Sequence, residues 1–303
     1  MNQWTTQRWI LFYAALPMAI HQVWIWTTGI SLHPVVAGIS YALALLNSIT
    51  QEIYRLRQLG EIHGYYDGDS ARAGIPDAGV VNLTNAIGRI LGIRMLMAAF
   101  LAYDRTIAPI DRLLQWQWWP TMFVIIGMHG LVLDFYYYWY HRAMHEILPL
   151  WKYHRAHHMV KHPTTIVGAY ASDEQELFDT AVIPFLAYIT LRAIGLPVGF
   201  YEWYICFSYL VFSEIIGHSG VRIVSGASTT FFWLLRMVGA ELQVEDHDLH
   251  HRYPRRHSVN MGKQTRLYDL IFGTAGERIE GRAENIDYSI PVSMPIFSRP
   301  SLS

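Results

Sequence analysis

The chain has 303 residues, of which only 16% are charged, against about 25% in a typical soluble domain. Together with 11 Trp and 19 Tyr, this shortage of charge indicates that part of the surface faces lipid. The net charge of −1 argues against a basic nucleic-acid footprint, and a single cysteine, Cys206, excludes a disulfide scaffold and cysteine-rich metal sites.

Six apolar segments are candidates for membrane-spanning helices: residues 9–28, 35–49, 85–103, 121–140, 181–196 and 201–216. The first has no charge and Trp at both ends, as a span requires, and membrane helices tolerate its Pro17. The third is the weakest, because Arg89 and Arg94 lie in its first half. The polar stretch 51–82 between the second and third segments is predicted to be a loop.

The order of these segments predicts which regions share a side of the membrane. If all six span, residues 51–82, residues 141–180 and everything after 217 lie on the side of the N-terminus. Those regions hold most of the Lys and Arg, so the positive-inside rule places them in the cytoplasm. We therefore expect an all-α, polytopic membrane protein with four to six spanning helices and a cytosolic helical cap. Alternatively, some segments are buried core helices or lie flat in the interface.

Histidine is the unusual residue, because ten of the 15 fall in two short stretches, 141–162 and 247–257. Three motifs stand out: His141 and His145; His154, His157 and His158; and His247, His250 and His251. On a helix, the spacings i, i+3 and i+4 bring the side chains of each motif to one face.

Eight clustered imidazoles predict a metal centre, because buried without a metal they would lack hydrogen-bond partners. A catalytic zinc needs only three protein ligands, so this number fits two ions. Imidazole suits zinc, copper, iron and nickel. Two histidine-held ions beside a membrane suggest oxygen activation near a lipid chain. Iron is favoured because an unactivated C–H bond requires redox chemistry that zinc cannot supply, although zinc can replace iron in a structure.

In this order the motifs resemble the fatty acid hydroxylase/sterol desaturase superfamily over about residues 120–275. Residues 138–142 (YWYHR) are similar to the start of its first histidine box, and residues 214–220 (EIIGHSG) to its intermediate His-Ser segment. Residues 260–262 (NMG) and 268–274 (YDLIFGT) resemble the two short motifs that follow its last box.

The resemblance implies an integral membrane di-iron oxidase with these ligands: His141, His145, His154, His157, His158, His247, His250 and His251, with His218 as a ninth. Some relatives have a further histidine where this chain has Glu214. That residue is therefore a carboxylate ligand, a partner of a ligand, or a polar interface residue. His162 is a ligand, a supporting residue or a surface residue.

Several other residues are candidates for a supporting role. Asp134 lies seven residues before His141, on the same helical face, and is expected to hydrogen-bond a ligand imidazole. One of the two aspartates that flank His247 is expected to orient an imidazole, and the acidic residues of 173–179 are expected to give similar support. His129 is expected to be a polar core residue or to line a cavity.

The implied reaction is O2-dependent hydroxylation of a sterol, fatty acyl, sphingoid, terpenoid or polyketide lipid. Without a fused haem domain, the two electrons come from an external donor such as cytochrome b5 and its reductase. An acidic donor could dock on basic residues, namely Arg252, Arg255, Arg256 and Lys263, unless these are simply solvated or contact headgroups. The alternatives are a desaturase on the same scaffold and a non-enzymatic metal transporter.

We expect three regions: N-terminal membrane helices with a cytosolic loop at 1–118, a catalytic domain at 119–280 and a tail at 281–303. By resemblance, the expected membrane is that of the endoplasmic reticulum, with the histidines facing the cytosol.

Overall fold

A computed structural model describes residues 1–68, 77–226 and 228–297 of the chain. Within these residues the regular structure is helical, and the extended contacts are two isolated β-bridges, Tyr65 with Val221 and Gly226 with Gln243. The prediction of an all-α fold is confirmed.

In the described part of the chain, four helices are long and apolar enough to cross a membrane. They are α1 (Gln3–Thr28), α2 (Pro34–His63), α3 (Asp77–Ala102, apolar over Asn85–Ala102) and α5 (Trp118–Glu146). Their outer faces carry exposed apolar side chains, such as Trp24 on α1 and Leu43 on α2. A bilayer would cover these faces, so the protein is a multi-pass membrane protein.

Helix α2 extends further than expected, because residues 51–63 are helical rather than loop. Their composition is polar, but Leu56 and Leu59 continue the helical spacing from Ile49 and are buried. With 30 residues α2 is about 45 Å long, which exceeds the hydrocarbon core, so its last turns extend beyond the membrane. The part of the predicted loop at 69–76 lies outside the described residues.

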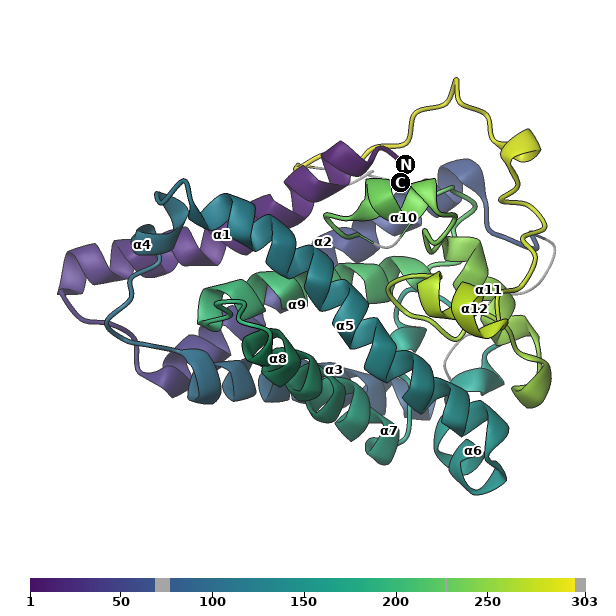
Figure 1. Cartoon of the computed structure of the whole chain (residues 1–303), viewed down its shortest axis with the longest axis horizontal. Helices are drawn as coiled ribbons and strands as arrows, with labels where there is room; N and C mark the ends of the chain where they lie inside the picture. Colours follow the sequence, from purple (N-terminus) through teal and green to yellow (C-terminus); the bar gives the residue numbers. More distant parts are fainter. Residues whose placement is uncertain (69–76, 227, 298–303) are drawn as a thin grey trace.

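The fifth and sixth apolar segments do not qualify as spans. Helix α8 (Ile183–Ala193) is continuous with α7 (Asp173–Leu177) through a π-helical turn, Phe178–Val182, and the joined helix carries four carboxylates in its first seven residues, which disfavours a span. Helix α9 (Phe200–Gly217) is buried along most of its length and runs through the middle of the helices in Figure 1. These two segments follow one another, so the chain returns to the same side of the membrane whether both span or neither does. The predicted side of every other region therefore does not change.

The two ends of the helix bundle differ. One end carries short connections around α4 (Ile110–Leu113), where Ser31 Oγ donates to the carbonyl of Arg105 at 2.7 Å. The opposite end, on the right of Figure 1, carries α6 (Leu148–His154), α11 (Val244–Arg252) and α12 (Leu267–Phe272), with α7 (Asp173–Leu177) and α10 (Phe232–Met237) nearby. The N-terminus lies there too, since Asn2 N–H donates to the carbonyl of Val292 at 2.8 Å.

Candidate metal centre

Nine buried or nearly buried histidines meet at the end of the bundle that carries α6, α11 and α12, which we call the cap. They form two groups. The first group consists of His141, His145, His154, His158 and His250, and the second of His157, His218, His247 and His251. Within each group the facing ring nitrogens all lie within 4.8 Å of one another. Every histidine that sequence reasoning placed in the metal site belongs to one of the two.

The C-terminal ends of α5, α6 and α9, with helix α11, bring these side chains together, and His218 follows the last residue of α9. The last turns of α5 place His141 and His145 in the first group. Helix α6 ends at His154, and a 3-10 turn, His157–Met159, follows. His154 and His158 therefore join the first group whereas His157 joins the second. The expectation that the second motif presents three imidazoles on one helical face is wrong, because the helix ends inside the motif.

The third motif is also divided, although it lies on one helix, α11. His250 belongs to the first group, and His247 and His251 belong to the second. Because the second and third motifs each contribute to both groups, the groups are adjacent: the rings of His158 and His251 stack with centroids 4.8 Å apart.

The ε nitrogens point toward one another. In the first group Nε2 of His154 lies 2.9 Å from Nε2 of both His141 and His158. In the second group Nε2 of His247 lies 2.8 Å from Nε2 of His218 and 3.2 Å from that of His251.

The other ring nitrogen, Nδ1, is held by the protein in seven of the nine. Nδ1–H donates to the carbonyl oxygens of Met261 (from His141, 2.8 Å), Arg255 (His145, 2.8 Å), Tyr170 (His157, 3.2 Å), Glu214 (His218, 2.7 Å), Val259 (His250, 2.7 Å) and Val160 (His251, 3.0 Å), and to the amide oxygen of Gln175 (His154, 3.0 Å). With Nδ1 as donor, Nε2 of each ring keeps its lone pair.

Burial keeps these rings neutral. It holds the pKa of His157, His247 and His251 well below the ordinary value, and the neighbouring imidazoles lower it further. The Nε2 atom of His145 is buried and has no hydrogen-bond partner among the residues that the structure describes. Lone pairs that converge in this way need an electron-pair acceptor, and a cation with affinity for imidazole meets that need. The donor set therefore fits two metal ions, one in each group.

Asp134 supports this arrangement indirectly. Its carboxylate is buried in α5 and accepts the backbone N–H groups of Lys263 (2.6 Å), Gln264 (2.9 Å) and Thr265 (3.1 Å). This holds the segment whose Met261 carbonyl binds His141. The prediction that Asp134 itself hydrogen-bonds an imidazole is wrong, because seven residues return to the same helical face but about 10 Å away along the axis.

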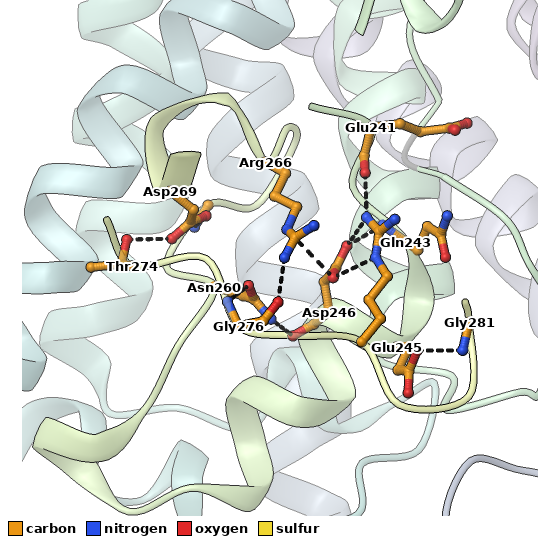
Figure 2. A network of polar contacts seen from close by, with 12 residues as sticks. Glu241, Gln243, Glu245, Asp246, Asn260, Arg266, Asp269, Thr274, Gly276 and Gly281 are labelled. Atoms are coloured by element: carbon orange, nitrogen blue, oxygen red, sulfur yellow. Dashed lines mark hydrogen bonds and ion pairs between the residues drawn. The ribbon is translucent and has the colours of Figure 1, made fainter. Parts of the chain in front are cut away.

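A buried polar network fixes α11, and Figure 2 shows its members. Asp246 accepts from the guanidinium of Arg278 at 2.6 and 2.8 Å, and the amide of Asn260 donates to the Asp246 carbonyl at 2.9 Å. The neighbouring Asp248 pairs with Arg252 at 2.5 Å. Neither aspartate beside His247 orients an imidazole, contrary to expectation, because both carboxylates bind arginines instead.

The two short motifs after the third histidine motif meet at Asp269. Its carboxylate accepts Met261 N–H (2.6 Å), Gly262 N–H (2.8 Å) and the Thr274 hydroxyl (2.7 Å), the last of which is drawn in Figure 2. A Cβ on Gly262 would collide with the Thr265 carbonyl and lie 2.9 Å from Asp269 Oδ2, so the close approach requires glycine. These motifs thus position the carbonyl that holds His141.

The carboxylate of Glu214 lies outside both histidine groups. It forms ion pairs with Lys263 (2.9 Å) and Arg94 (3.3 Å), and the residue supports His218 through its backbone carbonyl. His162 also lies outside the groups, with Nε2 3.6 Å from Asp67. His129 is buried in α5, away from both groups.

Sequence reasoning missed two supporting residues. Gln175, on α7, accepts from His154. Of the acidic residues expected to give support, Asp179 does so indirectly, because it accepts from the Gln175 amide at 3.3 Å, whereas Asp173 and Glu176 pair with Arg89 at 3.0 and 2.8 Å. Gly168 packs against His218, since a Cβ there would lie 2.9 Å from the ring Nδ1. Only carboxylates were considered as acceptors for the histidines, so the amide of Gln175 was not predicted. The contact of Gly168 with His218 depends on the fold and cannot be predicted from residue spacing.

An apolar cavity of about 50 Å³ adjoins the second group. Ile53 of α2, Leu91 of α3 and Val211 of α9 line it, and it reaches Gly168 beside His218. The charged side chains of Arg94 and Glu214 also line this cavity, and Gly168 separates it from His218.

Comparisons with known proteins agree with this geometry. Residues 126–274 match the family described as fatty acid hydroxylase, and this stretch includes all nine histidines. The fatty acid hydroxylase vlmA of Lecanicillium sp. is 39% identical over 313 residues, covering 100% of this chain and 85% of the relative.

Two other relatives match about half of the chain. A very-long-chain aldehyde decarbonylase of Oryza sativa subsp. indica is 29% identical over 161 residues, 52% of this chain and 24% of the relative. The ornithine lipid hydroxylase OlsE of Rhizobium tropici is 26% identical over 168 residues, 52% of this chain and 43% of the relative. No solved structure matches.

Proposed function

Because this chain belongs to the fatty acid hydroxylase/sterol desaturase superfamily and is an oxidoreductase, we propose that it hydroxylates an unactivated C–H bond of a lipid with O2. The observation that carries the proposal is the pair of adjacent groups of inward-facing Nε2 atoms. The first group would hold one iron ion and the second group the other. Iron supplies the redox chemistry that this reaction needs and that zinc lacks.

The protein itself orients the histidine rings and keeps water out of the site. The Nδ1 hydrogen bonds fix each ring and make its Nε2 a better donor. Burial of the histidines keeps solvent from the reacting atoms. The catalytic domain at 119–280 remains a prediction, and the matched stretch 126–274 lies inside it.

The substrate that these observations favour is a lipid with a long hydrocarbon chain. The relatives' names specify a fatty acid, a very-long-chain aldehyde and an ornithine lipid. The cavity beside Gly168 is mostly apolar, but at about 50 Å³ it is too small for such a chain, so the relatives' names carry this preference. Sterol, sphingoid, terpenoid and polyketide lipids are the other substrates to test.

We place the protein in the endoplasmic reticulum membrane with the histidines facing the cytosol, where cytochrome b5 and its reductase would supply electrons. Basic residues of the cap, such as Arg155 and Arg256, support this orientation. Glycosylation sites inserted at 29–33 and in the cap test it: the first should be glycosylated and the second should not.

Isotope labelling tests the reaction. The full-length protein, loaded with iron in lipid nanodiscs, is incubated with lipid extracts, reductant and ¹⁸O2. Hydroxylation places one ¹⁸O atom in the product, whereas desaturation, the alternative on this scaffold, places none. His250→Ala is the control for the histidine centre. An unlabelled alkene would support the desaturase, and the absence of any oxidised lipid would contradict both.

A further inference from the structure

Trp151 lies between the first histidine group and the protein surface. Its ring centroid is 5.3 Å from that of His145, 5.5 Å from His158 and 6.1 Å from His154. The side chain is partly exposed, so one aromatic system contacts both solvent and three of the five histidines of the group. Electron transfer slows steeply with distance, and an indole in contact with the ligands shortens the path from the surface.

The surface around Trp151 is basic. Lys152 and Arg155 are exposed on and just after α6, and Arg256 is exposed in the turn Arg255–His257. Arg255 and Arg256 both donate to the carbonyl of Glu146, at 3.2 and 3.4 Å, which places them at the junction of α5 and α6.

Arg255 connects this surface directly to the first group, because its carbonyl accepts from Nδ1 of His145. Its backbone has a φ of 31°, in the left-handed region that non-glycine residues rarely adopt. The surrounding structure therefore holds this residue in place, with its carbonyl toward the histidines.

Few acids offset the four cations. Glu146 pairs with Arg142 at 2.6 Å, and the charge of Glu174 on α7 acts on Lys152. Two cations expected from the sequence do not belong to this surface: Arg252 pairs with Asp248, and Lys263 is mostly buried against Glu214.

We propose that Lys152, Arg155, Arg255 and Arg256 dock an acidic one-electron carrier protein, and that Trp151 passes its electrons to the first histidine group. The proposal rests on the proposed function. Each turnover takes two electrons, one from each of two reduced carrier molecules, which leave oxidised. With two protons, these electrons reduce one oxygen atom of O2 to water while the other atom enters the substrate.

An anionic membrane surface would also attract these cations. The carrier is favoured because the basic residues surround the one partly exposed indole that contacts three histidines of the first group within the described chain. A surface that only binds headgroups would not need its cations to surround an indole that contacts the histidines.

The test measures how fast the reduced, soluble haem domain of cytochrome b5 is oxidised, without O2, by full-length protein that has been loaded with iron and oxidised to the ferric state. The protein is held in nanodiscs of phosphatidylcholine, and the haem absorbance is followed at several salt concentrations. The variant is Lys152→Glu with Arg155→Glu, and the matched control is Arg192→Glu, an exposed arginine at the end of α8. A second pair, Trp151→Leu and Trp151→Phe, tests the indole.

The double charge reversal should lower the bimolecular rate constant at low salt about tenfold or more and flatten its salt dependence, whereas Arg192→Glu should leave both unchanged. Trp151→Leu should slow transfer at saturating carrier, and Trp151→Phe should restore part of it. Iron content and reduction by dithionite should stay at the wild-type level in every variant.

Wild-type rates and salt slopes in the charge-reversed protein would overturn the docking proposal. The docking proposal would also be overturned if the charge-reversed protein lost only its binding to phosphatidylserine vesicles and kept wild-type electron transfer. That result would show that the basic surface binds headgroups. A wild-type protein that binds no iron, or forms no product after dithionite reduction, would instead contradict the proposed function.

Discussion

The carboxylate of Asp134 accepts the backbone N–H of Lys263 at 2.6 Å, although 129 residues separate them in the chain. The contact joins the middle of α5 to the segment that carries the Met261 carbonyl. One buried carboxylate thereby sets the position of a histidine that it does not touch.

Asp134→Asn should lower turnover about 10–100-fold and leave most of the iron bound, the effect typical of losing a residue that supports a ligand. The amide keeps only one of the two oxygens that hold residues 263–265, so His141 is less well oriented. The measurement is kcat together with iron per chain, and Asp111→Asn on α4, at the opposite end, is the control. Wild-type turnover would show that the segment needs no such anchor.

Gln175→Leu should weaken iron binding about 10–100-fold, because His154 loses the acceptor of its Nδ1–H. Gln175→Glu should restore only part of the affinity, since its carboxylate accepts from His154 but faces the Asp179 carboxylate to which the Gln175 amide donates at 3.3 Å. Glu174→Ala, at the exposed neighbouring position, should have no effect on iron. Competition with a chelator measures the affinities, and equal affinity of all four proteins would refute this role.

Arg278→Met should lower the free energy of unfolding by about 3–5 kcal/mol, because it leaves the buried Asp246 carboxylate without its main partner. Adding Asp246→Asn should recover part of the loss. Arg282→Met, which removes an exposed pair with Glu277, should change stability by less than about 1 kcal/mol. Thermal unfolding in nanodiscs gives the ranking, and equal Tm values for the two arginine variants would contradict it.

His157→Ala and His250→Ala should each abolish oxidation, since each removes a member of a different group. His257→Ala should be nearly neutral, because this residue is exposed and belongs to neither group. The assay is product formation per chain with O2. If His257→Ala is as damaging as His250→Ala, the third motif has been assigned wrongly.

Periodicity and spacing were sufficient to find eight of the nine histidines, because these eight lie in dense, repeated motifs. His218 was the exception, since a single histidine at a helix end has no spacing signal and was found only through the family resemblance. The division of the second motif could not be predicted. It depends on where α6 ends, and contacts with α5 and α11 decide which group each imidazole joins.

Supporting residues were harder to predict than the histidines. Asp134 shares a helical face with His141, but periodicity gives direction around the axis and not distance along it. The carbonyls that hold the imidazoles belong to the backbone, which every residue carries, so sequence gives no sign of which will be used. The extension of α2 to His63 depends on a few buried leucines within a polar stretch, and the polar composition of that stretch predicted a loop.

The central claim is that the cap holds two iron ions in two histidine groups. Its most direct test is iron per chain, measured by elemental analysis of full-length protein that has been loaded with ferrous iron without O2 and then desalted. The wild-type protein should contain two ions, and His157→Ala and His250→Ala should each contain one. One ion or none in the wild-type protein, or two in either variant, would contradict the account.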